Sequence, residues 1–265
     1  MSVRMVPVQR GELAAETTGA GPDIVFVHGF SLDRRSWQPQ VAHFAKTHRV
    51  TSYDLRGFGQ SSLPDGEYEH GDDLLALMDA LGIEKALLVG LSLGANVAMT
   101  FAARYPQRLS GLVLASPGLP GHPWKTERPP EAAARVAAAE GVEAGKRFWL
   151  DHPLFANLAR PPHMRDLIEI MVHDYSAWHW QGEGRGARLA PLPSGLEGIQ
   201  VPTLVISGRH DVDGYREIAR HIADRIAGAR FAELAEGGHM ANMDAADAFT
   251  SLVEEFSRRL PQDGR

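Results

Sequence analysis

An α/β fold is expected for this chain: a mostly parallel, doubly wound sheet with an N-terminal antiparallel hairpin and an inserted, mainly helical cap. Short apolar runs such as 24–27 and 86–89 alternate with helical patterns such as 72–81, and each run is apolar on both faces. Strands of this kind belong to parallel sheets that helices cover on both sides. A proline-rich stretch from 117 to about 198 has no such run, which predicts the cap.

The expected elements of the first half follow one another in a regular order. The segments 3–8 and 12–17 flank Gln9-Arg10-Gly11 and are typical of an antiparallel hairpin. Strands are expected at 24–27, 49–53, 86–89 and 112–115, and helices at 37–45, 72–81 and 93–104. Tyr105-Pro106 ends the last of these helices, because proline disfavours a helical conformation in the residue before it.

The second half contains the cap and the end of the sheet. Helical pieces are expected at 131–140 and 164–173, and the sheet resumes with strands at 203–206 and 230–234 on either side of a helix at 215–226. A helix over 243–260 closes the chain. We therefore expect a core domain of residues 1–116 and 199–265 and a helical cap of residues 117–198, which is an ordinary size for an inserted domain.

Composition excludes several classes of function. The chain has 265 residues, 44% of them apolar, and its 27 Lys and Arg against 33 Asp and Glu give a net charge of −6. This balance lacks the basic surface of a nucleic-acid-binding protein. The absence of cysteine excludes disulfides, thiolate zinc sites and a cysteine nucleophile. The N-terminus has no signal-peptide pattern and no apolar stretch approaches the roughly 20 residues that cross a bilayer, so we expect a cytoplasmic protein without membrane partners.

The segment Gly90-Leu91-Ser92-Leu93-Gly94 lies where the strand at 86–89 turns into the helix at 93–104. A serine on such a sharp, strained turn has its hydroxyl raised above the sheet, and flanking glycines leave room for the neighbouring chain. The N-terminus of the helix directs its N–H groups to the same place. Ser92 is therefore the candidate nucleophile, and its placement disfavours the alternative of an incidental serine in a strand–helix turn.

A nucleophilic serine needs a base, and the base needs an acid to orient it. His239 lies in a glycine-rich loop after the last strand, and Asp211 follows the strand at 203–206. Both are at the carboxyl ends of strands, where ligands of open α/β sheets bind. Asp213 is the alternative acid, although it also suits the N-cap of the following helix.

Four features together resemble the α/β-hydrolase family over essentially the whole chain. They are His28-Gly29-Phe30 after a strand, the segment 54–62, the Ser92 turn, and Asp211 with His239 in late loops. The resemblance implies a serine hydrolase without metal or organic cofactor, with Ser92, His239 and Asp211 as nucleophile, base and acid. It also implies an oxyanion hole formed by the backbone N–H groups of Phe30 and Leu93. The first half is most similar to carboxylesterases, enol-lactonases and perhydrolase-like esterases.

Two positions depart from the family pattern. Ala95 occupies a position where relatives often have a second glycine, and Val212-Asp213-Gly214 lacks the proline that relatives often have there. The second departure leaves the choice between Asp211 and Asp213 open. Asp54 and Arg56 are expected to brace the loop beneath the site as a pair, because structural ion pairs also gather near active sites.

The expected cap is rich in aromatic residues and contains four of the five tryptophans of the chain. They form either an aromatic wall over the serine, suited to an apolar or aromatic substrate group, or the small core of the cap itself. The residues concerned are Trp124, Phe148, Trp149, Phe155, Tyr175, Trp178 and Trp180, with His152, His163, His173 and His179 among them. His173, Asp174 and His179 lack a metal-ligand spacing, so no metal site is expected.

The expected function is hydrolysis of a small carboxylic ester or lactone through an acyl-enzyme intermediate. One alternative keeps the same three residues but cleaves a C–C bond in a vinylogous diketone. That reaction needs a cation for the substrate carboxylate, and the candidates are Arg160, Arg165, Arg185 and Arg188. A ligand receptor on a hydrolase scaffold is the second alternative, because fold does not imply activity. The sequence leaves open whether the chain forms a homodimer.

Overall fold

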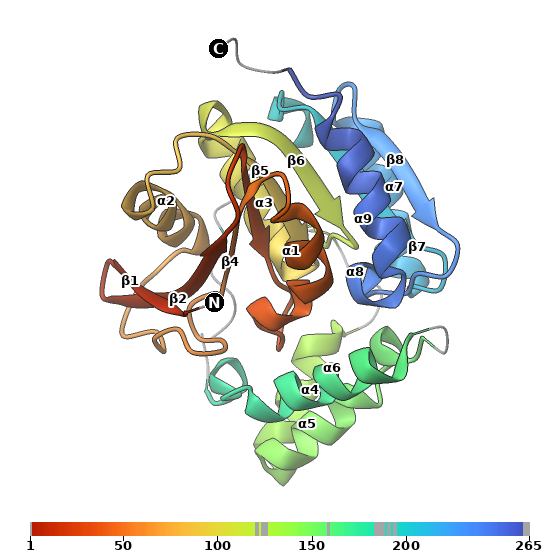
Figure 1. The fold of residues 1–265 in the computed structure, drawn as a ribbon. Coiled ribbons are helices and arrows are strands. Elements are labelled where there is room, and N and C mark those ends of the chain that lie inside the picture. The colour runs from red at the N-terminus through yellow and green to blue at the C-terminus, as the bar shows by residue number, and fades with distance from the viewer. Residues whose placement is uncertain are drawn as a thin grey trace.

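The computed structural model describes residues 2–119, 122, 127–157, 160–182, 189, 192 and 195–261. These residues contain one eight-stranded sheet with the strand order β1-β2-β4-β3-β5-β6-β7-β8 (Figure 1). The strands are β1 (Arg4–Val8), β2 (Gly11–Thr18), β3 (Asp23–Val27), β4 (Arg49–Tyr53), β5 (Ala86–Leu91), β6 (Leu109–Ala115), β7 (Thr203–Gly208) and β8 (Arg230–Leu234). Only the pairs β1–β2 and β2–β4 are antiparallel, which confirms the expected mixed sheet with an N-terminal hairpin.

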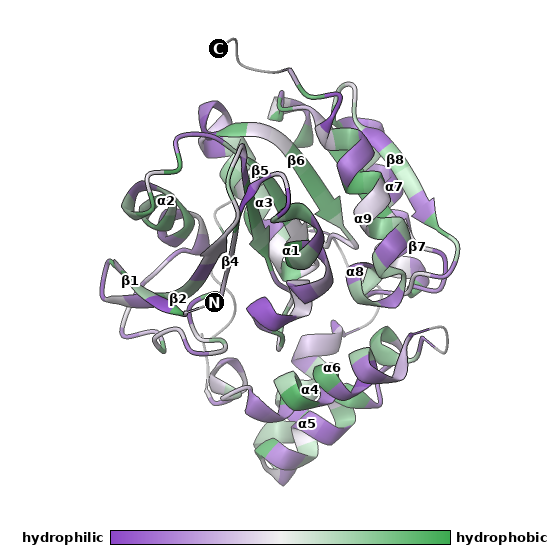
Figure 2. Cartoon of the chain, viewed as in Figure 1, coloured by the Kyte–Doolittle hydropathy of each residue, from purple (hydrophilic) through white to green (hydrophobic). Residues whose placement is uncertain are grey.

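Helices cover both faces of the sheet. On one face α1 (Gln38–Phe44) contacts α9 (Ala246–Ser257), and on the other α2 (His70–Ala80) contacts α3 (Leu93–Arg104) (Figure 1). A further helix, α7 (Asp213–Arg225), packs on β7. Every residue of β5 and β7 is buried, as expected of central strands between two helical layers. In Figure 2 the central strands β5 and β6 are largely green, whereas a helix such as α9 carries both green and purple residues.

The C-terminal helix is shorter than its apolar pattern predicts. The segment 243–260 is divided between α8 (Ala241–Asp244) and α9, because Ala245 has the non-helical angles φ −130° and ψ 55°. The predicted helix at 37–45 likewise begins as a 3-10 turn, η1 (Arg34–Trp37), which the side chain of Asp33 caps by accepting the N–H of Arg35. Helical periodicity alone does not detect such a break, since the apolar positions continue through it.

The segment between β6 and β7, residues 117–198, is called here the inserted segment. Its described part contains no strand. It has three α-helices, α4 (Pro129–Glu140), α5 (Val142–Leu150) and α6 (Pro162–Asp174), which lie at the bottom of Figure 1. Three short 3-10 helices accompany them, η3 (Pro153–Phe155), η4 (Trp178–Trp180) and η5 (Leu196–Gly198). The sequence did not predict α5, whose interior contains Gly145. That glycine allows close packing, because a Cβ there would lie 2.6 Å from the Cβ of Ala137 in α4. Trp124, Arg185 and Arg188 lie outside the described residues.

Within the described part of the chain, no helix combines the length and the apolar character that are needed to cross a bilayer.

Candidate active site

Ser92 occupies the sharp turn between β5 and α3. Its backbone angles, φ 52° and ψ −109°, are rare for a residue with a β-carbon. The Ser92 N–H donates to the carbonyl of Ala115 over 2.9 Å, and the Ser92 carbonyl accepts the N–H of Asn96 over 3.0 Å. These backbone bonds hold the strained turn in place, so the conformation of the turn does not depend on contacts of the Ser92 side chain.

The two glycines of the turn are required by close backbone approaches. A Cβ on Gly90 would collide with the carbonyl of Gly94, and a Cβ on Gly94 would collide with the carbonyl of Val27 at the end of β3. Ala95, where relatives often have glycine, is accommodated with no exposed surface. The turn therefore needs glycine on each side of Ser92 and tolerates the alanine that follows.

The structure brings His239 and Asp211 to Ser92. The Nε2 atom of His239 lies 2.9 Å from the Ser92 Oγ, and its Nδ1 atom lies 2.9 and 3.0 Å from the two carboxylate oxygens of Asp211. The imidazole is 2% exposed and Asp211 is 6% exposed. Asp213 is the first residue of α7, and its side chain is 86% exposed and paired with Arg216. The geometry thus favours Asp211 over Asp213 as the partner of His239.

Hydrogen-bond roles follow from these distances. A carboxylate only accepts, so the proton of the neutral imidazole belongs on Nδ1, where it is donated to Asp211. Nε2 is then an acceptor for the Ser92 hydroxyl. The N–H of Val212 also donates to Asp211, over 2.8 Å, and helps to fix the carboxylate. Such an arrangement can remove a proton from the hydroxyl as it attacks a carbonyl carbon.

Phe30 and Leu93 are the residues whose N–H groups were expected to form an oxyanion hole. Among the described residues, neither N–H donates to a protein acceptor. His28 shapes the loop that carries Phe30: its Nε2 accepts the N–H of Leu55 over 2.9 Å, so its Nδ1 donates to the Gly29 carbonyl over 2.8 Å. Burial lowers the pKa of His28, which keeps the ring neutral in this role.

A small pocket opens at Ser92. Its lining residues are Gly29, Phe30, Ser92, Pro130, Trp149, Leu154, Tyr215, His239 and Met240. Its cavity volume is about 20 Å³, which is enough for one or two waters or a small chemical group. Sequence reasoning did not identify Pro130, Leu154, Tyr215 or Met240. Met240 adjoins His239 in the chain, whereas nothing in the sequence brings Leu154 or Pro130 to the site.

The ring of Tyr215 packs against the imidazole of His239, with their centroids 4.3 Å apart. Burial, and the negative charge of Asp211 to a smaller extent, raises the pKa of the Tyr215 hydroxyl. The phenol therefore remains neutral and gives His239 an apolar neighbour on one side.

Of the aromatic residues in the inserted segment, Trp149 reaches the pocket. Its Nε1 donates to the Ser31 Oγ over 2.6 Å, and its ring meets Phe30 edge-on at 5.9 Å. Tyr175 and Trp180 also contact the Phe30 ring, and His179 stacks on Phe58 at 4.4 Å. These rings pack between the inserted segment and the sheet domain. Part of the aromatic wall that was expected over Ser92 therefore forms the apolar interface between the two. Phe148 is 38% exposed and belongs to neither.

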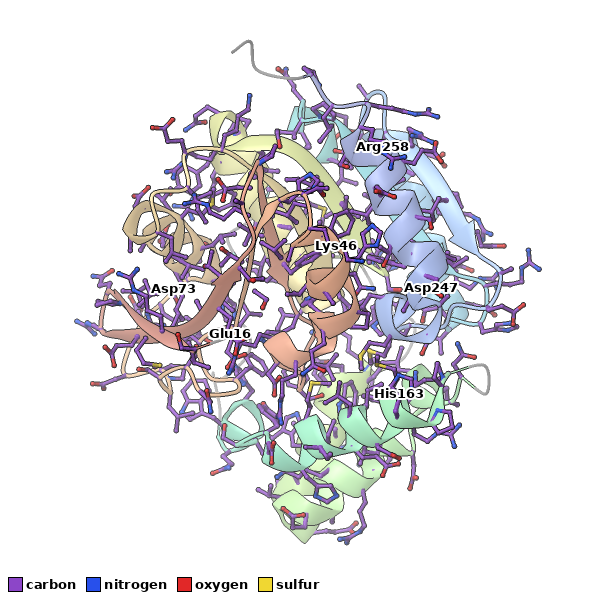
Figure 3. All side chains as sticks on the ribbon, in the orientation of Figure 1. Glu16, Lys46, Asp73, His163, Asp247 and Arg258 are labelled. Atoms are coloured by element: carbon purple, nitrogen blue, oxygen red, sulfur yellow. The ribbon has the colours of Figure 1, made fainter. Side chains whose placement is uncertain are left out.

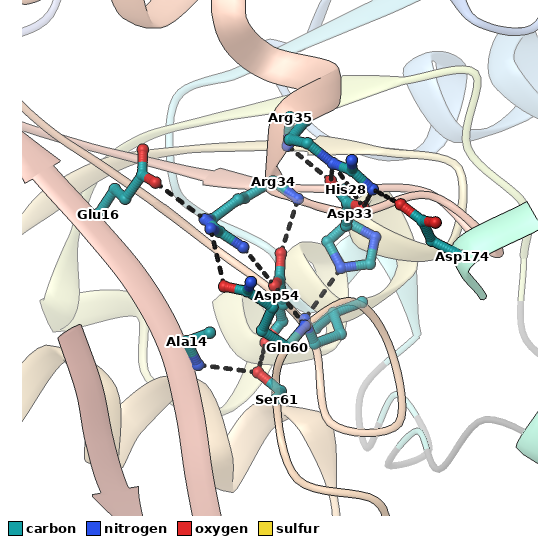
Figure 4. Close-up of polar contacts among 11 residues, drawn as sticks. Ala14, Glu16, His28, Asp33, Arg34, Arg35, Asp54, Gln60, Ser61 and Asp174 are labelled. Atoms are coloured by element: carbon teal, nitrogen blue, oxygen red, sulfur yellow. Dashed lines mark hydrogen bonds and ion pairs between the residues drawn. The ribbon is translucent and has the colours of Figure 1, made fainter. Parts of the chain in front are cut away.

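Asp54 and Arg56 brace the loop through separate partners, so the expected pairing of the two was wrong. Asp54 accepts the backbone N–H and the Nη1 of Arg34, over 2.8 and 2.6 Å, and the N–H of Gln60 (Figure 4). Arg56 pairs with Asp73 of α2 over 2.6 Å and donates to two carbonyls of the hairpin turn. Asp54 and Arg56 are two residues apart in the same loop, but their side chains contact different parts of the fold.

The charged and histidine candidates of the inserted segment are dispersed. Arg160 is buried in an ion pair with Asp244, and Arg165 is exposed on α6. His173 is exposed, and Asp174 pairs with Arg35 over 2.7 Å. His179 is buried, where its Nδ1 lies 2.9 Å from the Tyr175 hydroxyl.

Two buried histidines predict a loss of stability in acid. Burial lowers the pKa of His70 to about 3 and that of His179 to about 4. In the unfolded chain both have an ordinary pKa near 6.5, so only the unfolded state gains these protons as pH falls below that value. Their contribution to stability is complete above pH 6.5 and is lost progressively until pH 3–4. For His70 alone, the loss at pH 5 is about 2 kcal/mol.

The variant His70→Leu tests this dependence. The free energy of unfolding is measured by guanidinium denaturation at pH 7 and at pH 5. Its decrease from pH 7 to pH 5 should be about 2 kcal/mol smaller in the variant than in the wild type. His163→Leu, at an exposed position of α6 (Figure 3), is the control and should behave as the wild type. Equal acid sensitivity in His70→Leu and the wild type would contradict the assignment.

Comparison with known proteins agrees with this architecture. The family model of the alpha/beta hydrolase fold matches residues 22–246. The enol-lactonase from Burkholderia xenovorans LB400 is 32% identical, with a TM-score of 0.80 over 94% of this chain and 97% of its own. A thermophilic esterase from Thermogutta terrifontis is 30% identical, with a TM-score of 0.78 over 98% and 99% of the two chains. The 2-hydroxymuconate semialdehyde hydrolase of Pseudomonas sp. strain CF600 is 28% identical over 90% of this chain and 88% of its own. The protein belongs to the α/β-hydrolase fold family.

Proposed function

We propose that this protein is a serine hydrolase that cleaves a small carboxylic ester or lactone through an acyl-enzyme. The observation that carries the proposal is the continuous chain of contacts from the Asp211 carboxylate through His239 to the Ser92 Oγ, each about 2.9 Å long. Membership of a hydrolase family with enol-lactonase and esterase relatives supports the same reaction class.

In the proposed mechanism Ser92 attacks the substrate carbonyl while His239 takes the hydroxyl proton at Nε2. Asp211 holds the imidazole in the tautomer that leaves Nε2 free, and it stabilises the imidazolium. The N–H groups of Phe30 and Leu93 stabilise the negative charge that develops on the carbonyl oxygen. Each such donor contributes about 3 kcal/mol to lowering the barrier. His239 then protonates the leaving alcohol, and water releases the acid by the same steps in reverse.

The lining of the pocket favours a small, uncharged acyl group. Apart from Ser92 and His239, the described side chains that line it are aromatic or aliphatic: Phe30, Pro130, Trp149, Leu154, Tyr215 and Met240. A buried carboxylate needs a partner charge or several donors. The described lining offers no cation, which favours esters over the C–C bond hydrolysis of a diketone acid. We further propose that residues 117–198 act as a cap, since Trp149, Pro130 and Leu154 close the pocket from that side.

A fluorophosphonate probe and a panel of esters test the proposal together. The probe should label the wild type covalently and leave Ser92→Ala unlabelled, because its phosphorus reacts with the activated serine. 4-Nitrophenyl esters graded from acetate to octanoate should be hydrolysed fastest at the short end, since the pocket is small. An unlabelled wild type would remove support for a serine hydrolase and favour the receptor alternative. Rapid turnover of a diketone acid with feeble ester hydrolysis would assign the C–C reaction instead.

Leu154 should limit the length of the acyl group. In Leu154→Ala, the ratio of kcat/KM for butyrate over acetate is expected to rise about tenfold, because a pocket discriminates single methylene groups by 1–3 kcal/mol. Ile170→Ala, on α6 and 49% exposed, is the control and should keep the wild-type ratio. An unchanged ratio in Leu154→Ala would place the acyl group elsewhere in the site.

A further inference from the structure

A buried ion pair connects the inserted segment to α8, the short helix that directly follows the loop carrying His239. The Nε of Arg160 lies 2.5 Å from the Asp244 Oδ1, and the two side chains are 1% and 0% exposed. Arg160 also donates from Nη1 to the carbonyl of Phe155 over 2.8 Å. Further hydrogen bonds support the pair, since Arg160 bonds to Phe155 and Asp244 accepts a second N–H, although the Nη2 of Arg160 is buried without a partner among the described residues.

The second oxygen of Asp244 bonds directly to the residue before the candidate base. The N–H of Gly238 donates to Asp244 Oδ2 over 2.8 Å. A neighbouring bond also ties the loop to the inserted segment, since Asn157 Nδ2 donates to the carbonyl of Glu236 over 2.9 Å. The backbone N–H of Gly238, the residue before His239, is therefore held by a carboxylate whose charge is balanced by an arginine of the inserted segment.

The helix α8 is also anchored to the sheet domain, through Asn242. Asn242 donates from Nδ2 to the carbonyl of Ser36 over 2.8 Å, and the side chain of Gln40 donates to the Asn242 carbonyl over 3.0 Å. These three residues are fully buried. The position of the loop and of α8 therefore depends both on the contacts with the inserted segment and on the contacts with the sheet domain.

We propose that Asp244, held by Arg160, is a positioning residue for His239, so that the base reaches Ser92 only while the inserted segment is docked on the loop. The inference rests on the proposed serine hydrolase function. Neither Arg160 nor Asp244 lines the described pocket, and the bond from the Gly238 N–H to Asp244 is the contact that connects the pair to the His239 loop.

Asp244→Asn tests the proposal. The amide keeps the size of the side chain and an acceptor for Gly238, but it leaves the Arg160 charge unbalanced and weakens the contact. We expect kcat for 4-nitrophenyl acetate to fall about 10²-fold with little change in KM, because a displacement of about 1 Å in a reacting group has an effect of this size. The Nδ1–H proton resonance of His239 should shift or broaden. An unchanged kcat and resonance in the folded variant would overturn the proposal.

A second buried pair provides the matched control. Arg56 and Asp73 are 1% and 6% exposed and join the hairpin to α2, where Asp73 lies at the left of Figure 3. Asp73→Asn should lower the Tm while leaving kcat and the His239 resonance as in the wild type. An equal fall of kcat in Asp73→Asn and Asp244→Asn would indicate that the Arg160–Asp244 pair has only a structural role, and it would contradict the inference.

Two further measurements keep the result decisive. If Asp244→Asn does not fold, Arg160→Lys is assayed in its place, because lysine keeps the charge but loses the fixed Nε and Nη1 geometry; wild-type kcat would overturn the proposal. If the wild type hydrolyses no ester and reacts with no fluorophosphonate, the proposed function fails, whereas hydrogen exchange at Gly238 and the His239 resonance still report on the loop. Unchanged values of both in Asp244→Asn would then reject the positioning role on its own.

Discussion

Ser92→Ala is expected to lower kcat for 4-nitrophenyl acetate about 10⁶-fold, the size of effect that loss of the nucleophile has in a serine hydrolase. The hydroxyl is the group that forms the acyl bond, and the strained turn holds it 2.9 Å from the His239 Nε2. The variant should keep the fold, since the turn is held by backbone bonds to Ala115 and Asn96. Initial rates and circular dichroism measured on the same preparation provide the check.

His239→Ala should have nearly the same effect, and the double variant should be no slower than either single one. Residues that act as a unit lose their function once any member is removed, so their effects do not add. Ser251→Ala and His163→Ala, at exposed positions, are the controls and should retain wild-type kcat. Multiplicative losses in the double variant would indicate that Ser92 and His239 act in separate steps.

The grouping of Ser92, Asp211 and His239 could be predicted because each of the three residues follows a strand. The strands at 49–53 and 230–234 and the helix at 93–104 agree with the structure to the residue. Ser92, Asp211 and His239 then meet because the carboxyl ends of parallel strands lie along one edge of the sheet. This inference uses only the positions of the three residues after strands that run parallel, which the sequence pattern predicts.

Contacts between distant parts of the chain could not be predicted in the same way. Arg160 and Asp244 are separated by 84 positions, and Arg160 was an equally good candidate for binding a substrate carboxylate. Leu154 reaches the pocket through the packing of the inserted segment, which follows from side-chain shape rather than from periodicity. The helix α5 escaped prediction because Gly145, unfavourable in an isolated helix, is needed for its contact with α4.

Asp211→Asn is expected to lower kcat about 10⁴-fold, because an amide stabilises the wrong tautomer of its histidine partner. In the protein, both carboxylate oxygens lie within 3.0 Å of the His239 Nδ1, so the carboxylate requires a proton on that nitrogen. The asparagine NH₂ group can donate to Nδ1 instead, which moves the ring proton to Nε2. Nε2 would then face the Ser92 hydroxyl as a donor, and the imidazole could not accept its proton.

Asp213→Asn is the matched control, because it makes the same chemical change two positions further along the chain. Asp213 is 86% exposed and pairs with Arg216 at the start of α7. Such a surface pair contributes about 0–1 kcal/mol to stability and does not reach the site. We expect its kcat to equal that of the wild type. Activity retained in Asp211→Asn but lost in Asp213→Asn would reverse the assignment of the acid, and would require the segment 211–214 to rearrange when substrate binds.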